Sequence, residues 1–196
     1  MEELTGRFRE DDKEFDIDFP EFDPKRFYQS AEPSYSEDLI EIYQFFQSEF
    51  GLPRRVFYPC CDRDASPTRA FPKSEVIQLD ISEDAVDLLK RHGIEALSGD
   101  VRKYRPEEKF DLLILLNPCI KTRNATHTIK RGGHIIANDY HGNTTQMLRN
   151  PFKYKFHGTI HHGKKPMKML DTKYSKRLLN ETNPFFNLYS VFTKRF

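Results

Sequence analysis

The feature that most constrains the fold of this chain is a short, almost entirely apolar run, FDLLILL, at residues 110–116. Only Asp111 interrupts it. A strand that is exposed on one face alternates apolar and polar residues, whereas a strand covered on both faces does not. The run therefore predicts a central strand of a parallel sheet, buried on both sides.

Further strands are predicted on either side of this run, at residues 55–58, 75–79, 94–97 and 134–137. Residues 82–91 begin with a serine and two acidic residues, end with two basic residues and are soon followed by Gly93, which is the pattern of a capped helix. Strands that alternate with helical crossovers indicate an α/β protein with a doubly wound, mostly parallel sheet.

The flanks of this region add a helix and two more strands. Ser36 can cap a helix that ends at Gly51 and buries one apolar face. A helical turn or two is expected at 144–149, and residues 154–160 and 188–192 are expected to form an antiparallel pair at the sheet edge. We expect two parts: residues 1–35, an acidic extension containing aromatic residues, and residues 36–196, the α/β domain.

Composition excludes several classes of protein. With 196 residues, 37% hydrophobic and 31% charged, the chain suits one soluble domain. Its longest apolar run is too short to cross a bilayer, and its acidic start lacks the pattern of a secretory signal. Three cysteines do not make a disulfide framework. These features predict a cytoplasmic protein that does not enter a membrane.

The charge is distributed unevenly along the chain. Residues 1–23 are acidic, whereas residues 149–177 are rich in lysine and arginine. The basic region is a candidate for binding a polyanion, although a solvated lysine surface explains it somewhat better. We also hypothesise that the acidic segment folds back on this basic surface.

Polar residues follow each predicted strand. In open α/β sheets, ligands bind beyond the carboxyl ends of the strands, where the strand order reverses. The candidate site is therefore made of the residues that follow the five strands in turn: Pro59, Cys60, Cys61 and Asp62; Asp80; Asp100; Asn117, Pro118 and Cys119; and Asn138, Asp139, Tyr140 and His141.

This layout resembles the class I S-adenosylmethionine-dependent methyltransferases over roughly residues 36–140. In that family an acid at the end of the second strand holds the ribose hydroxyls, and a Gly-Asp pair after the third strand lies beside the adenine. VIQLD at 76–80 and SGDV at 98–101 occupy those places. FDLLILLNP at 110–118 and IKRGGHIIAN at 129–138 look like the family's motifs at the fourth and fifth strands.

The resemblance implies S-adenosylmethionine as cofactor and implies a set of residues that bind it. These are Tyr58, Pro59, Cys60, Asp62, Asp80, Ile81, Asp100, Val101 and Asn117.

The first loop, VFYPCCDRD at residues 56–64, departs from the family pattern because it contains no glycine. Cys60, Asp62 and Asp64 stand where the family has three glycines, and Tyr58 replaces the usual acid. Glycine serves there because it allows positive φ and a close approach to the cofactor. We therefore expect the loop to run differently or to lie farther from a ligand. The short helix after it is expected to begin with Ser66 as its cap.

Two functions remain open at this point. In one, the protein is a methyltransferase of unknown acceptor, with the sulfonium attracted by Asp62 or Asp64 and the ribose held by Asp80. In the other, it is a catalytically inactive scaffold or a module that binds nucleic acid or protein through its basic region. An oxidoreductase that uses a nicotinamide cofactor is less well supported, because the Gly-x-Gly-x-x-Gly motif is absent.

The residues that would act on the acceptor are Asn117, Asp139, Tyr140 and His141. Asn117 and the following proline resemble the motif with which amino-methylating members hold a planar nitrogen, but Cys119 and Ile120 replace that motif's continuation. For the other three, a polar loop that turns at Gly142 is an equally good explanation.

The cysteines support two interpretations and no metal site. Cys60 or Cys61 could approach Cys119, because the first and fourth strands should be neighbours. A reversible disulfide is one interpretation, and small buried residues are the better one. No histidine is placed to complete a metal site.

Overall fold

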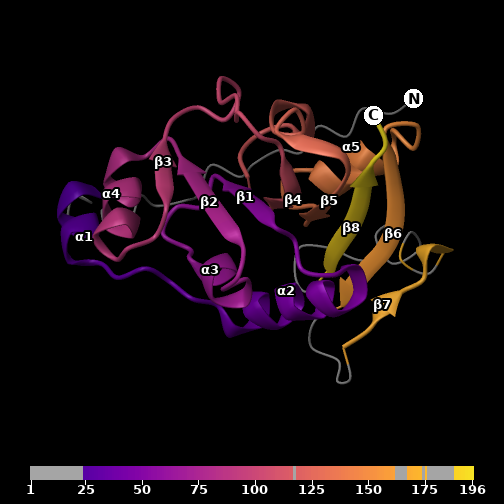
Figure 1. Cartoon of the computed structure of the whole chain (residues 1–196), viewed down its shortest axis with the longest axis horizontal. Coiled ribbons are helices and arrows are strands. Elements are labelled where there is room, and N and C mark those ends of the chain that lie inside the picture. Colours follow the sequence, from indigo (N-terminus) through magenta and orange to yellow (C-terminus); the bar gives the residue numbers. More distant parts are fainter. Residues whose placement is uncertain (1–23, 117, 162–166, 174, 176–187) are drawn as a thin grey trace, which may run out of the picture.

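The computed structural model describes residues 24–116, 118–161, 167–173, 175 and 188–196 (Figure 1). In this part of the chain the strands form one mixed sheet in the order β3-β2-β1-β4-β5-β8-β6-β7. The strands are β1 Arg55–Pro59, β2 Glu75–Asp80, β3 Ala96–Ser98, β4 Phe110–Leu115, β5 Ile129–Ala137, β6 Tyr154–His161, β7 Met169–Leu170 and β8 Leu188–Lys194.

The first five strands run parallel, as the sequence predicted. At the other end of the sheet, β8 runs antiparallel to both β5 and β6, and β7 pairs antiparallel with β6. The predicted antiparallel pair is therefore confirmed, with β8 inserted between β5 and β6 (Figure 1).

The helices are α1 Pro24–Ser30, α2 Glu37–Phe50, α3 Ser66–Ala70, α4 Glu83–Arg91 and α5 Asn143–Leu148, with a 3-10 turn, η1, at Thr122–Asn124. Ser36 caps α2 by accepting a hydrogen bond from the N–H of Leu39, and Ser82 caps α4 in the same way. The predicted cap of α3 is wrong by one residue: Ala65 holds that position. The Ser66 hydroxyl instead accepts from the N–H of Ser36 and joins α2 to α3.

Two hydrophobic cores lie on opposite faces of the sheet. Helices α2, α3 and α4 cover one face, where Phe46 and Leu89 pack with Leu112 and Ile114 of β4. On the other face, residues such as Met147 of α5 pack with Leu113 and Leu115 of the same strand. Successive residues of β4 thus enter different cores, which explains the nearly continuous apolar run.

The second face is covered more thinly than a doubly wound sheet predicts. Within the described residues, the connections from β3 to β4 and from β4 to β5 contain no α-helix, only turns and η1. The strand β5 also begins earlier than predicted, because Ile129 pairs with Phe110 before the register shifts toward His134. The predicted third strand moves to Ala96–Ser98.

Residues 24–35 pack onto the α/β domain beside α4 (Figure 1). The guanidinium of Arg91 in α4 donates a hydrogen bond of 2.7 Å to the carbonyl oxygen of Tyr28 in α1. Among the described residues, no helix is both long and apolar enough to span a membrane.

Candidate active site

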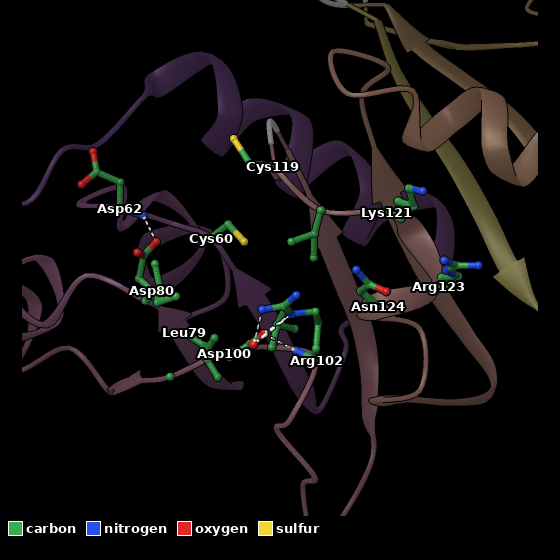
Figure 2. Close-up of a pocket in the computed structure, with 14 residues that line it drawn as sticks. Cys60, Asp62, Leu79, Asp80, Asp100, Arg102, Cys119, Lys121, Arg123 and Asn124 are labelled. Carbon is green, nitrogen blue, oxygen red and sulfur yellow. Dashed lines mark hydrogen bonds and ion pairs between the residues drawn. The ribbon is translucent and has the colours of Figure 1, made fainter.

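A cavity of about 900 Å³ opens at the carboxyl ends of β1, β2, β3 and β4 (Figure 2). The strand order reverses here, because the chain continues from β1 to β2 on one side and reaches β4 on the other. Six of the residues predicted to bind the cofactor line this cavity: Cys60, Asp62, Asp80, Ile81, Asp100 and Val101. The topology therefore brings together side chains from Cys60 to Val101, which lie 41 positions apart in the sequence.

One wall of the cavity carries three carboxylates, one from the end of each of β1, β2 and β3. Asp80 accepts hydrogen bonds from the N–H of Asp62 at 2.9 Å and from the N–H of Ser82 at 3.0 Å, one on each oxygen. Asp100 pairs with the guanidinium of Arg102, and the hydrogen bonds from Arg102 lower the pKa of this carboxyl to about 2. Both carboxylates are thus held in place by the chain itself (Figure 2).

The first loop adopts a left-handed backbone at two of the positions where glycine was expected. Cys60 has φ of 57° and Asp62 has φ of 49°. Hydrogen bonds from Cys60 N–H to the Leu79 carbonyl at 2.7 Å, and from Asp62 N–H to Asp80, hold this conformation. The loop therefore keeps the backbone conformation for which glycine is usually selected. The expectation that it must run differently does not hold at these two positions.

Asp64, the third of these positions, is turned away from the cavity. Its carboxylate accepts hydrogen bonds from the Tyr58 hydroxyl at 3.0 Å and from the N–H of Ser66 at 2.9 Å. This leaves Asp62 as the acid of the loop that reaches the cavity.

The segment before α2 supports the same loop. The Tyr28 hydroxyl donates a short hydrogen bond to Asp62, and burial together with this bond raises the pKa of Tyr28 to about 12. The backbone of Ser34 donates to Arg63 at 2.8 Å and accepts from Ala65 at 2.8 Å. Sequence reasoning missed this role, because no local pattern pairs a tyrosine with an acid 34 residues away.

The opposite wall comes from the connection between β4 and β5. Cys119, Ile120, Lys121, Arg123 and Asn124 line it, so the cavity has an acidic and a partly basic side (Figure 2).

No protein-family model and no curated protein matches the sequence. Solved structures do match the fold. The N-methyltransferase NodS from Bradyrhizobium japonicum WM9, in complex with S-adenosyl-L-homocysteine, is 12% identical with a TM-score of 0.59 over 88% of this chain and 93% of that one. A second structure of NodS is also 12% identical, with a TM-score of 0.58 over 81% of this chain and 96% of that one. The crystal structure of Thermoplasma acidophilum 1320 is 14% identical, with a TM-score of 0.53 over 87% of this chain and 94% of that one. The protein has the class I methyltransferase fold.

Within the class I methyltransferase fold, not every predicted residue reaches the cavity. Tyr58 is buried and bonded to Asp64, and neither Tyr58 nor Pro59 is among the described residues that line the cavity. Asn117, predicted both to bind the cofactor and to act on the acceptor, lies outside the described residues.

The other acceptor candidates follow β5. The carboxylate of Asp139 accepts from the N–H of Thr145 at 2.8 Å and from its hydroxyl at 2.5 Å, which anchors the start of α5. Tyr140 is exposed, and its ring lies nearly perpendicular to that of His141, with the ring centres 4.9 Å apart. His141 places Nε2 3.5 Å from the Sγ of Cys119, which itself lines the cavity.

The three cysteines are free thiols, but the favoured interpretation as small buried residues holds only for Cys61, because Cys60 is partly buried and Cys119 is exposed. Cys60 and Cys119 line the same cavity, so the predicted approach of the two loops occurs. Burial, with a smaller effect from Asp80, raises the pKa of Cys60 to about 12 and that of Cys61 further. No cluster of three metal-binding side chains exists among the described residues.

The predicted basic region lies only partly within the described residues. Arg149, Lys153 and Lys155 are exposed. The contact expected between residues 1–23 and this region lies outside what the structure describes.

Proposed function

We propose that the protein is a methyltransferase that uses S-adenosylmethionine. The observation that carries this proposal is the left-handed backbone of Cys60 and Asp62, which brings the first loop against Asp80 although the loop has no glycine. Strained backbone of this kind costs about 1–3 kcal/mol per residue and is concentrated at functional sites and ligand clamps.

The chemistry of the cavity fits this cofactor. Each carboxylate oxygen can accept about two hydrogen bonds. In Asp80, each oxygen already accepts one hydrogen bond from a backbone N–H. Asp80 can therefore still accept from the two hydroxyls of a ribose. Leu79, Val101 and Ile120 offer apolar contact to a purine ring. The fold is also that of NodS, whose structure contains S-adenosyl-L-homocysteine.

The residues of the cavity would act mainly by position and charge. The bound cofactor would supply a methyl group activated by a positively charged sulfur. Asp62 and Asp80 give the nearby wall a negative potential that favours such a cation over a nucleotide phosphate, whereas the charge of Asp100 is balanced by Arg102. Methyl transfer requires the acceptor in line with the methyl carbon, so orientation contributes more to the rate than proton transfer does. The acceptor is not identified by the cavity lining.

Isothermal titration with S-adenosylmethionine and S-adenosylhomocysteine tests the proposal. We expect micromolar binding that weakens at least about tenfold in Asp80→Ala, since a lost hydrogen bond to a charged group is worth about 1.5–3 kcal/mol. Asp87→Ala, which removes an exposed acid of α4, is the matched control and should bind normally. A well-folded protein that releases no heat with either nucleoside would contradict the proposal.

A scaffold that binds a polyanion is the second candidate, favoured by a groove of about 620 Å³ lined by Arg131, Lys155, Lys194 and Arg195. For this function we expect binding of a polynucleotide that falls steeply with salt. Lys155→Glu should abolish it, whereas binding that is independent of salt would exclude it.

A further inference from the structure

A thiol and an imidazole meet beside the proposed cofactor cavity. The Sγ of Cys119, in the loop after β4, lies 3.5 Å from the Nε2 of His141, in the loop after β5. This distance is within the range of a hydrogen bond to sulfur. Because β4 and β5 are neighbouring parallel strands, their loops emerge side by side at the carboxyl edge of the sheet.

Helix α5 ties the two loops together. It begins two residues after His141, and its buried Asn143 donates hydrogen bonds of 3.1 Å to the carbonyl of Ile120 and to the hydroxyl of Thr122. Gln146 of the same helix accepts from the N–H of Thr122 at 3.0 Å. The helix therefore fixes the loop that carries Cys119 relative to the loop that carries His141.

Cys119 differs from the other cysteines in its surroundings. It is exposed and lines the cavity (Figure 2), whereas Cys61 is buried and Cys60 is partly buried. Burial keeps the thiols of Cys60 and Cys61 protonated by raising their pKa. Cys119 is instead exposed and lies next to a histidine, which places a nucleophile within hydrogen-bond distance of a base.

We propose that Cys119 is a nucleophile, with His141 as its base, and that it takes a ligand with a double bond conjugated to a carbonyl. The thiol proton moves to Nε2 of His141, the sulfur forms a bond to the electron-poor carbon, and the π electron pair moves onto the carbonyl oxygen. Breaking of the carbon–sulfur bond reverses the step, so no oxidant or reductant is required. The proposal about Cys119 rests on the proposed function in one respect: the ligand would be the methyl acceptor, held beside the cofactor.

The probe for this site is N-ethylmaleimide, a small conjugated carbonyl compound. The full-length protein is labelled at pH 7, and the rate at each of the three cysteines is followed by mass spectrometry of peptides. We expect Cys119 to react much faster than the other two. His141→Gln should slow labelling of Cys119 by about tenfold or more, since a positioned base contributes roughly 10²–10⁴-fold to proton transfer.

The controls separate activation from simple exposure. His92→Gln, at a histidine beyond α4, should leave the rate at Cys119 unchanged, and Cys119→Ser should remove the fast label. A His141→Gln rate within about twofold of the wild type, in a protein of unchanged thermal midpoint, would overturn the proposal. Labelling needs no cofactor, so the outcome of the nucleoside titration does not affect this test, and the two proposals can fail separately.

Discussion

At the scale of single residues, the first loop shows that residues other than glycine can adopt the positive φ angles that this position requires. Cys60 and Asp62 hold a left-handed backbone that costs a residue with a β-carbon about 1–2 kcal/mol. Aspartate tolerates this region better than most residues. Hydrogen bonds to Leu79, Asp80 and Tyr28 offset the cost, so the loop is supported by its surroundings rather than by its own freedom.

This strain makes Cys60 sensitive to the shape of its side chain. In Cys60→Val we expect the free energy of unfolding to fall by about 1–2 kcal/mol relative to Cys60→Gly, because a β-branched residue at positive φ is an outlier. Cys60→Gly itself should stay within about 1 kcal/mol of the wild type, since relief of strain is offset by the greater entropy of the unfolded chain. Urea unfolding of the three proteins measures both values, and equal midpoints for the two variants would contradict the prediction.

At the scale of elements, the strands and the caps of α2 and α4 were predictable because their signals are local. Short, nearly continuous apolar runs mark the central strands, and a serine followed by acids marks α2 and α4. Four of the cavity residues, Cys60, Asp62, Asp80 and Asp100, followed from the topology, whereas Ile81 and Val101 followed from the resemblance to the methyltransferases. The support of the loop by α1 depends on contacts far apart in sequence, and the positive φ angles are held by hydrogen bonds to Leu79 and Asp80. Neither leaves a pattern that can be read from the residues.

The contact of α1 with the loop should be visible in cofactor affinity. Tyr28→Phe removes only the hydroxyl that binds Asp62. We expect the dissociation constant for S-adenosylhomocysteine to rise about three- to tenfold, since a partly exposed bond of this kind is worth roughly 1 kcal/mol.

Tyr35→Phe is the matched control for this change. Tyr35 lies in the same segment, but its ring packs against the guanidinium of Arg69, whose central carbon lies 3.5 Å from the ring centre. Isothermal titration should show unchanged affinity for this variant. If Tyr28→Phe binds as tightly as Tyr35→Phe, α1 does not support the site.

At the scale of the whole molecule, half-buried histidines couple stability to pH. The ring of His157 in β6 lies 5.2 Å from that of Phe50 in α2 and 5.9 Å from that of His134 in β5. Burial lowers the pKa of His134, and burial together with Lys155 lowers that of His157 to about 4. These rings are therefore neutral in the folded protein at pH values where the unfolded chain binds protons.

The direction of the pH effect follows from this difference. Between about pH 6.5, the ordinary value for histidine, and pH 4, the unfolded chain binds more protons, so stability present above pH 6.5 is lost as the pH falls. We expect the loss between pH 7.5 and pH 5 to be smaller in His157→Gln by about 1 kcal/mol, after allowance for solvent screening of a half-buried ring. Urea unfolding at the two pH values measures it; an equal loss in the variant and the wild type would exclude His157 as the cause.

The position of β8 has a consequence for the order in which the protein can be built. During synthesis β6 and β7 are made before β8, yet β8 is the strand that pairs with β5 on one side and with β6 on the other. Until it arrives, β5 and β6 both present unpaired edges, which are templates for pairing with other chains. The parallel part of the sheet can assemble early, whereas the antiparallel part must wait. Nascent chains halted before β8 should therefore be the form of this protein most dependent on chaperones.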